Sequence, residues 1–251
     1  MKKASRLFAM FAASFGAAVV GLGATNAVAA ARSGAIALST TLCCGSSSPE
    51  VKAAAAAGLT TTIVDPVTWN SMTTADFKKF KLIILGDPRC KAAPAPIRPA
   101  ARNADTWADA VKGNVIVIGS DPTLHHFVGK NSAGATDLIK NGIAWAASKG
   151  PTGAYITLSC YYHAARKGTA VPALSGFGSF SVEGQALGGG CPEAAKVVNT
   201  EGALSSVTSA RLSHWHCSVH EAFSSFSAKR FEVMAQSPNF SPTAPYILIR
   251  G

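Results

Sequence analysis

The chain has 251 residues, and 48% of them are hydrophobic, so it is long enough and apolar enough to bury a sizeable core in one domain. The formal net charge is +10 at pH 7. No run of Lys or Arg exceeds two residues, so we interpret the excess of basic residues as solvent-exposed surface. We therefore predict no nucleic-acid partner.

The first thirty residues have the pattern of a secretory signal peptide. Three basic residues precede an uncharged apolar run over 7–24, and Ala27-Val28-Ala29 fits the small-x-small cleavage rule. A membrane anchor is the alternative, because an apolar run of this length is near the minimum that spans a bilayer. We predict a signal peptide over 1–30, a mature domain over 31–251 without a membrane span, and a secreted or periplasmic location.

The mature chain keeps an even number of cysteines, which favours disulfides in an exported protein. Cys43 and Cys44 are adjacent, so we expect them to take different partners. We expect Cys160 to pair with Cys191 or Cys217. The six disulfide candidates are Cys43, Cys44, Cys90, Cys160, Cys191 and Cys217.

Apolar strands alternate with helices in the first half. Ser48 and Pro49 form a helix start with Ser as N-cap, and Gly58 ends that helix. We predict strands over 35–38, 60–64, 81–85, 114–118 and 154–158, and helices over 49–57, 74–77, 104–112 and 135–148. In the second half we predict a hairpin or an excursion from the sheet over 174–182, and strands over 231–235 and 246–249.

Five strands separated by helices predict a mostly parallel α/β sheet, and ligands of such sheets bind at the carboxyl ends of the strands. The strand ends carry Asp87, Asp121, His125, Ser159 and His163. We therefore expect these residues to collect at one edge of the sheet, together with the late pair His220-Glu221.

This edge supplies the candidate site. The candidate catalytic residues are Asp121, His125, His163, His220 and Glu221, with His125 or His163 as acid/base and Asp121 or Glu221 orienting it. The candidate binding residues are Asp87, Ser159, Tyr161 and Trp215.

Three alternative interpretations of these motifs stay open. Asp121 could be the N-cap of a following helix. Cys160 and His163 could form a Cys-His nucleophile instead of a disulfide half. His214, His216, His220 and Glu221 could bind a metal, but their order is not His-Glu-x-x-His, and we predict no metal and no cofactor.

Several of these motifs together resemble the class I glutamine-amidotransferase-like superfamily, in particular its ThuA-like branch. They are Asp65, the strand end Leu85-Gly86-Asp87, the long helix, and His220-Glu221 ahead of 231–235. Asp121-Pro122-Thr123-Leu124-His125 is similar to an element of uncharacterised secreted bacterial proteins. The resemblance implies a flavodoxin-like three-layer sandwich with a mostly parallel sheet, and Glu221 and Phe223 as its late acidic-aromatic pair.

One departure from that family bears on activity. Active glutamine amidotransferases carry a nucleophilic Cys in a Gly-x-Cys-x-Gly elbow, and the matching turn here, Gly119-Ser120-Asp121-Pro122, has none. Glutamine hydrolysis by that route is therefore not expected, and fold alone does not determine function.

Two functions remain as hypotheses. The first is a hydrolase that acts on a small molecule or an extracellular polymer through a His/Asp/Glu crevice. The second is a non-catalytic, disulfide-stabilised binding module for a carbohydrate or a cell surface, with stacking platforms drawn from Trp69, Trp107, Trp145 and Trp215. The sequence does not determine the oligomeric state.

Overall fold

The computed structural model of the protein describes residues 33–129, 131–184, 191–240 and 243–251. The predicted signal peptide over 1–30 lies outside the described residues. Among the helices in these ranges, none combines the length and the apolar character needed to cross a bilayer.

A sheet of eight strands forms the centre of the described domain, in the order β2-β1-β3-β5-β4-β11-β10-β8. The first five strands in this order run parallel to one another, and β11, β10 and β8 add on as antiparallel neighbours. The prediction of a mostly parallel α/β sheet is confirmed. The strands are β1 (Ala35–Leu38), β2 (Thr61–Val64), β3 (Leu82–Leu85), β4 (Val115–Ile118), β5 (Gly153–Thr157), β8 (Lys196–Val197), β10 (Glu232–Ser237) and β11 (Ala244–Arg250).

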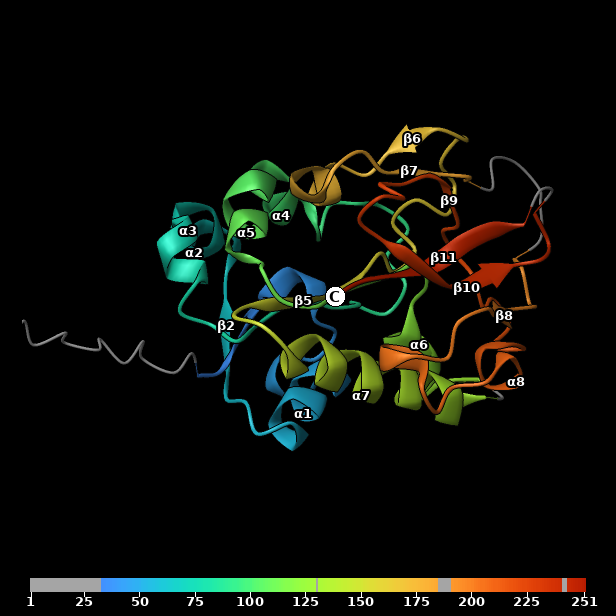
Figure 1. The fold of residues 1–251 in the computed structure, drawn as a ribbon, viewed down its shortest axis with the longest axis horizontal. Helices are drawn as coiled ribbons and strands as arrows, with labels where there is room; N and C mark the ends of the chain where they lie inside the picture. The colour runs from blue at the N-terminus through green and yellow to red at the C-terminus, as the bar shows by residue number, and fades with distance from the viewer. Residues whose placement is uncertain (1–32, 130, 185–190, 241–242) are drawn as a thin grey trace, which may run out of the picture. The chain divides into compact units, whose positions relative to one another are not determined.

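Helices cover both faces of this sheet, with α1 and α7 on one side and α4 and α5 on the other (Figure 1). The helices are α1 (Pro49–Ala56), α2 (Pro66–Ser71), α3 (Thr74–Phe77), α4 (Arg98–Arg102), α5 (Ala104–Ala110), α6 (Pro122–Phe127), α7 (Ser132–Ser148) and α8 (Ser209–Leu212). Short 3-10 turns are η1 (Ser39–Thr41), η2 (Gly45–Ser47), η3 (Pro172–Phe177) and η4 (Gly202–Leu204).

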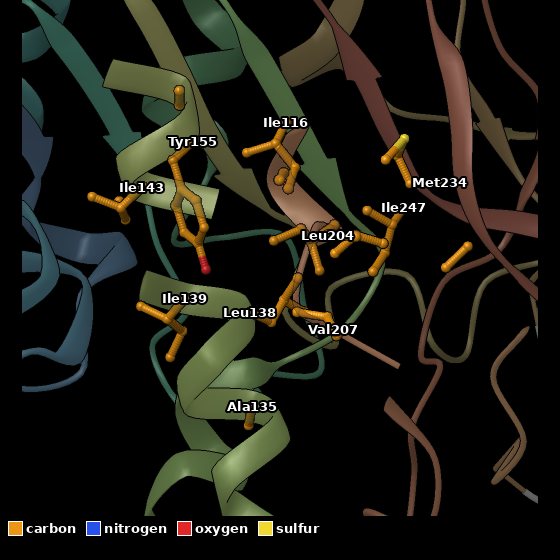
Figure 2. Packing of buried hydrophobic residues seen from close by; sticks show 14 of the residues in the cluster. Ile116, Ala135, Leu138, Ile139, Ile143, Tyr155, Leu204, Val207, Met234 and Ile247 are labelled. Carbon is orange, nitrogen blue, oxygen red and sulfur yellow. The ribbon is translucent and has the colours of Figure 1, made fainter. Parts of the chain in front are cut away.

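Alternation along the strands divides the core between these two faces. Side chains of a strand point alternately to opposite sides, so Leu82 and Ile84 join one cluster while Ile83 and Leu85 join the other. Figure 2 shows the first cluster, in which Leu138 and Ile139 of α7 pack near Tyr155 of β5. Continuous burial of β1, β3, β4 and β5 explains why their sequences are apolar without alternation.

The second half builds a smaller antiparallel sheet in the order β6-β7-β9. Its strands are β6 (Thr169–Ala170), β7 (Ser181–Val182) and β9 (Phe223–Ser225). The expected hairpin over 174–182 is thus mostly the turn η3 followed by β7, which pairs with β6 upstream. The predicted strands over 231–235 and 246–249 are confirmed as β10 and β11.

Local capping follows the sequence only in part. α1 begins at Pro49 as predicted, but the Ser48 hydroxyl accepts the Cys44 N–H at 3.1 Å and makes no capping bond to the helix. Asp65 caps α2, accepting the N–H groups of Val67 and Thr68 at 2.7 and 2.9 Å. This carboxylate therefore serves an exposed helix end and does not belong to the site.

Candidate functional site

The carboxyl ends of β3, β4 and β5 lead into one buried group of polar side chains. Asp87, which follows β3, is fully buried and joins three segments. Its Oδ1 accepts the Ser159 hydroxyl at 2.6 Å and the Cys90 N–H at 3.1 Å, and its Oδ2 accepts the Leu124 N–H at 3.0 Å. The structure thus brings together the strand-end residues that the sequence places at this edge.

A second buried carboxylate, Glu50, supports the same region from the first turn of α1. Its Oε1 accepts the Asp87 N–H at 3.0 Å and also the Thr123 hydroxyl. Sequence reasoning treated Glu50 only as part of a helix start. The available signal was topological, since a helix that follows a strand begins at the same edge where the strand ends.

These two carboxylates position α6, the short helix that carries His125. Asp87 accepts the N–H of Leu124 and Glu50 accepts the hydroxyl of Thr123, so both bonds hold the first turn of α6. Asp121 occupies the N-cap position of α6 but makes no capping bond. The alternative interpretation of Asp121 as a helix cap is therefore wrong, because Asp87 already satisfies the helix N–H and the Asp121 carboxylate faces two imidazoles.

Asp121 lies between two histidines from distant parts of the chain. Its Oδ1 is 3.0 Å from Nε2 of His125 and 3.0 Å from Nε2 of His220. These are ion-pair contacts by distance, and the N–H directions of the rings miss hydrogen-bond geometry. Contacts of this kind tighten in substrate complexes of enzymes, so their alignment here is compatible with catalysis.

His125 keeps its second nitrogen free of any hydrogen bond to the described part of the chain. The ring lines a hollow of about 320 Å³ between α6 and the late segment. Gly129 lines the same hollow, and a Cβ added to Gly129 would lie 3.5 Å from Nδ1 of His125, so this buried nitrogen lies next to a residue of the hollow's wall. The remaining lining residues are Leu124, Val128, Trp215, His216, Cys217 and His220.

Backbone hydrogen bonds also join His220 and Glu221 to the end of β4. The carbonyl of Gly119 accepts the N–H groups of His220 and Glu221 at 3.1 and 3.0 Å, and the Gly119 N–H donates to Tyr246 at 2.7 Å. A side chain at Gly119 would overlap the carbonyl of Glu221. Glycine at this position therefore lets two segments about one hundred residues apart meet at the site.

Charge in this group is divided among carboxylates with different surroundings. Burial alone would raise the pKa of Asp121, but the imidazoles of His125 and His220 lower it below its ordinary value. Burial, with the Asp121 charge nearby, raises the pKa of Asp87 to about 6, and burial raises the pKa of Glu50 to about 7. Of these three carboxylates, the one between the histidines therefore ionises at the lowest pH.

Glu221 and His163 are two further ionisable residues close enough to Asp121 to feel its charge. Glu221 is fully buried, its Oε1 accepts the Tyr162 N–H at 3.0 Å, and burial raises its pKa well above the ordinary value. His163 is half-buried, and its ring centre lies 5.1 Å from that of His220. Burial, and then the neighbouring His220, lower the pKa of His163. Neither residue lines the hollow beside His125.

The candidate binding residues are mostly internal. Ser159 is fully buried and bound to Asp87, and Tyr161 is packed in the hydrophobic core. Trp215 borders the hollow, but it is 1% exposed, and its Nε1 donates to the Arg211 carbonyl at 2.9 Å. The role of Trp215 as a sugar platform is therefore wrong. Trp69 and Trp107 are likewise buried and cannot stack on sugars.

The disulfides differ from the expected pairing. The structure joins Cys43 to Cys44, Cys90 to Cys160 and Cys191 to Cys217. The prediction that Cys43 and Cys44 take different partners is wrong, since the other four cysteines pair among themselves. Cys160 pairs with Cys90 because β3 and β5 are neighbours in the sheet, which brings the two loops at their ends together. Cys160 is therefore no free nucleophile in this state.

Unusual backbone conformations mark the same loops. Non-glycine residues with positive φ are Arg89, Cys90, Ser159, His214 and His216. Such conformations cost of order 1–3 kcal/mol each and persist where surrounding contacts enforce them, frequently at functional sites.

His214 and His216 are exposed while His220 is buried, so the alternative metal set of His214, His216, His220 and Glu221 does not converge.

No family model, curated protein or solved structure matches this chain.

Proposed function

We propose that the protein is a hydrolase in which His125 activates water and Asp121 orients His125. The observation that carries the proposal is the pair of His125 nitrogens in different surroundings. Nε2 lies 3.0 Å from a buried carboxylate oxygen, whereas Nδ1 is buried next to Gly129, which lines the hollow, and has no hydrogen-bond partner among the described residues. A carboxylate beside one nitrogen favours the proton there and leaves a lone pair on the other.

The chemistry follows from that tautomer. His125 Nδ1 takes a proton from a water molecule as the water oxygen bonds to the carbonyl carbon of an ester or amide. The proton then passes to the leaving alkoxide or amine as its bond to that carbon breaks. His220, on the other side of Asp121, shares the carboxylate and helps to keep it in place.

Size and lining suggest the substrate class. About 320 Å³ is near the low end of small-molecule sites, and apolar side chains supply much of the wall. The substrate is accordingly a small ester or amide with an apolar part, or the exposed end of an extracellular polymer. No cofactor and no nucleic acid takes part in this proposal.

The test compares hydrolysis rates of nitrophenyl esters, anilides and glycosides by wild type, His125→Ala and Asp121→Asn. Loss of the base lowers the rate by about 100- to 10,000-fold. His126→Ala is the matched control, because His126 is on the same helix but contacts Thr136 and does not line the hollow. Equal rates in wild type and His125→Ala would exclude this site as the catalyst.

A non-catalytic binding module for a carbohydrate or a cell surface is the second candidate. Three disulfides favour it, because they stabilise a rigid scaffold in the way common to small extracellular binding domains. Binding of a compound in the hollow without turnover of any member of the panel would select this function over the hydrolase.

We also propose an amidotransferase-like origin and export from the cell. The order β2-β1-β3 agrees with the flavodoxin-like order 2-1-3-4-5, whereas β5 lies between β3 and β4 here. We therefore propose a relative of the flavodoxin-like fold in which β4 and β5 have exchanged places. Disulfides support a secreted or periplasmic location, and mass spectrometry of the exported chain would test cleavage near residue 30.

A further inference from the structure

Four potential metal ligands from two distant parts of the chain lie together on the far side of His220 from Asp121. His163, Cys191, Cys217 and His220 each offer one ligand atom, and these atoms all lie within 4.8 Å of one another. We propose that reduction of the Cys191–Cys217 disulfide converts this group into a binding site for one Zn²⁺ ion. Two thiolates and two imidazoles are the donors that Zn²⁺ takes in tetrahedral protein sites.

The ring of His220 is oriented as in a metal-ligating histidine whose second nitrogen contacts a carboxylate. Its Nδ1 lies 3.4 Å from Sγ of Cys217, and its Nε2 lies 3.0 Å from Oδ1 of Asp121. A histidine that ligates a metal through one nitrogen usually directs the other to a carboxylate, which fixes the ring. Asp121 is 0% exposed and His220 is 5% exposed, so this arrangement is built into the interior of the domain.

His163 supplies an independent observation. Its Nδ1 is buried and has no hydrogen-bond partner among the described residues, although buried polar atoms almost always have one. The rest of the His163 side chain and Cys191 are half-buried, so an ion can enter from this side. One ring nitrogen of His163 lies within 4.8 Å of both sulfurs, and an imidazole whose hydrogen-bonding capacity is unused in this way is suited to a metal bond.

Another set, Cys90, Asp121, Cys160 and His220, also brings its ligand atoms within 4.8 Å of one another. It is the weaker candidate for two reasons. Asp121 already contacts His125, and three of the four members are buried, which leaves little access for an ion. We therefore assign zinc to the set that contains His163 and Cys191.

The redox step balances with a dithiol reductant. The dithiol supplies two electrons and two protons to the Cys191–Cys217 bond and itself becomes a disulfide. The two released thiols then lose their protons to solvent as Zn²⁺ binds the thiolates. Oxidation by another disulfide reverses the sequence and releases the ion, so zinc binding reports the redox state of the protein.

The experiment measures zinc retained after gel filtration by the purified protein, oxidised and then reduced with a phosphine. We expect one zinc per chain in the reduced protein and none in the oxidised protein. His163→Ala and Cys217→Ser should abolish retention, and Asp121→Asn should weaken affinity by roughly 10- to 100-fold. His214→Ala, at an exposed neighbouring histidine, and the double variant Cys90→Ser/Cys160→Ser should both retain the ion.

Cobalt replaces zinc in a second readout, in which thiolate-to-metal charge transfer and tetrahedral d–d bands identify the ligands. Retention that survives His163→Ala but is lost in Cys90→Ser/Cys160→Ser would overturn the assignment, as would equal binding by oxidised and reduced protein. If reduction unfolds the chain, zinc should refold it, because metal affinity adds to stability. A reduced chain that stays unfolded with zinc also contradicts the proposal. Hydrolysis is tested on the oxidised protein, so the two proposals fail separately.

Discussion

Replacing Glu50 with Gln should remove a pH-dependent loss of stability. Glu50 is fully buried, and burial raises its pKa from the ordinary 4.5 to about 7 in the folded protein. Between these values the unfolded chain has released a proton that the folded chain still holds. The free energy of unfolding therefore falls as pH rises from about 4.5 to about 7, and the Glu50 contribution is constant above that range.

The magnitude follows from the two pKa values. Each step of one in pKa is worth about 1.4 kcal/mol, so the shift from 4.5 to about 7 lowers the free energy of unfolding by about 3 to 4 kcal/mol once the carboxyl is fully ionised in both states. Glutamine keeps the Oε1 acceptor for the Asp87 N–H and the Thr123 hydroxyl, so both bonds that hold α6 can persist. Any change in the free energy of unfolding that the amide itself causes does not depend on pH, so it does not affect the slope of the comparison.

Urea unfolding of wild type and Glu50→Gln at several pH values from 4 to 8 measures this effect. We expect the stability of the variant relative to wild type to increase across the range by up to about 3 to 4 kcal/mol. Glu232→Gln, at an exposed position of β10, is the control and should show only a small change. A difference between Glu50→Gln and wild type that is constant with pH would refute the reasoning.

Two further predictions concern the disulfides and the docking of the late segment. The Cys90–Cys160 bond spans 70 residues of sequence, so Cys90→Ser/Cys160→Ser should lower the free energy of unfolding by about 4 kcal/mol. The Cys43–Cys44 bond closes almost no loop, so Cys43→Ser/Cys44→Ser should lower it far less. Equal losses of stability in urea unfolding would contradict this loop-closure effect. Gly119→Ala should destabilise by roughly 1–3 kcal/mol or more, because its Cβ would overlap the Glu221 carbonyl. Thermal unfolding measures this effect. Gly251→Ala, whose Cβ would make only ordinary contacts, is the control and should leave the midpoint unchanged. An unchanged midpoint for Gly119→Ala would show that the two segments can separate without cost.

The polar edge was predictable because parallel strands end on the same side of a sheet. Runs such as 81–85 and 154–158 identify buried strands, so Asp87 and Ser159 had to lie at the same edge of the sheet once the sheet was parallel. The contact between Asp121 and His125 was predictable as well, since residues four apart meet on a helix or its first turn.

Which strands are neighbours in the sheet, and therefore which cysteines pair, was not predictable in the same way. The choice of Cys90 as the partner of Cys160 depends on β5 lying beside β3, and local sequence does not encode that order. Glu50 was overlooked because a single acid in the first turn of a helix looks like a favourable surface residue. Only the packing of α1 against the ends of the strands makes it a buried partner of Asp87 and Thr123.

By itself, then, the sequence determined the α/β class, the strands and the edge at which polar residues gather, because these depend on local apolar patterns and on the common direction of parallel strands. Only the tertiary structure decided which nitrogen of His125 lies against the Asp121 carboxylate, that Asp121 contacts two histidines, and that Trp215 and Tyr161 are core residues. These outcomes depend on contacts between segments far apart in the chain, where a small change in strand order or packing exchanges one partner for another.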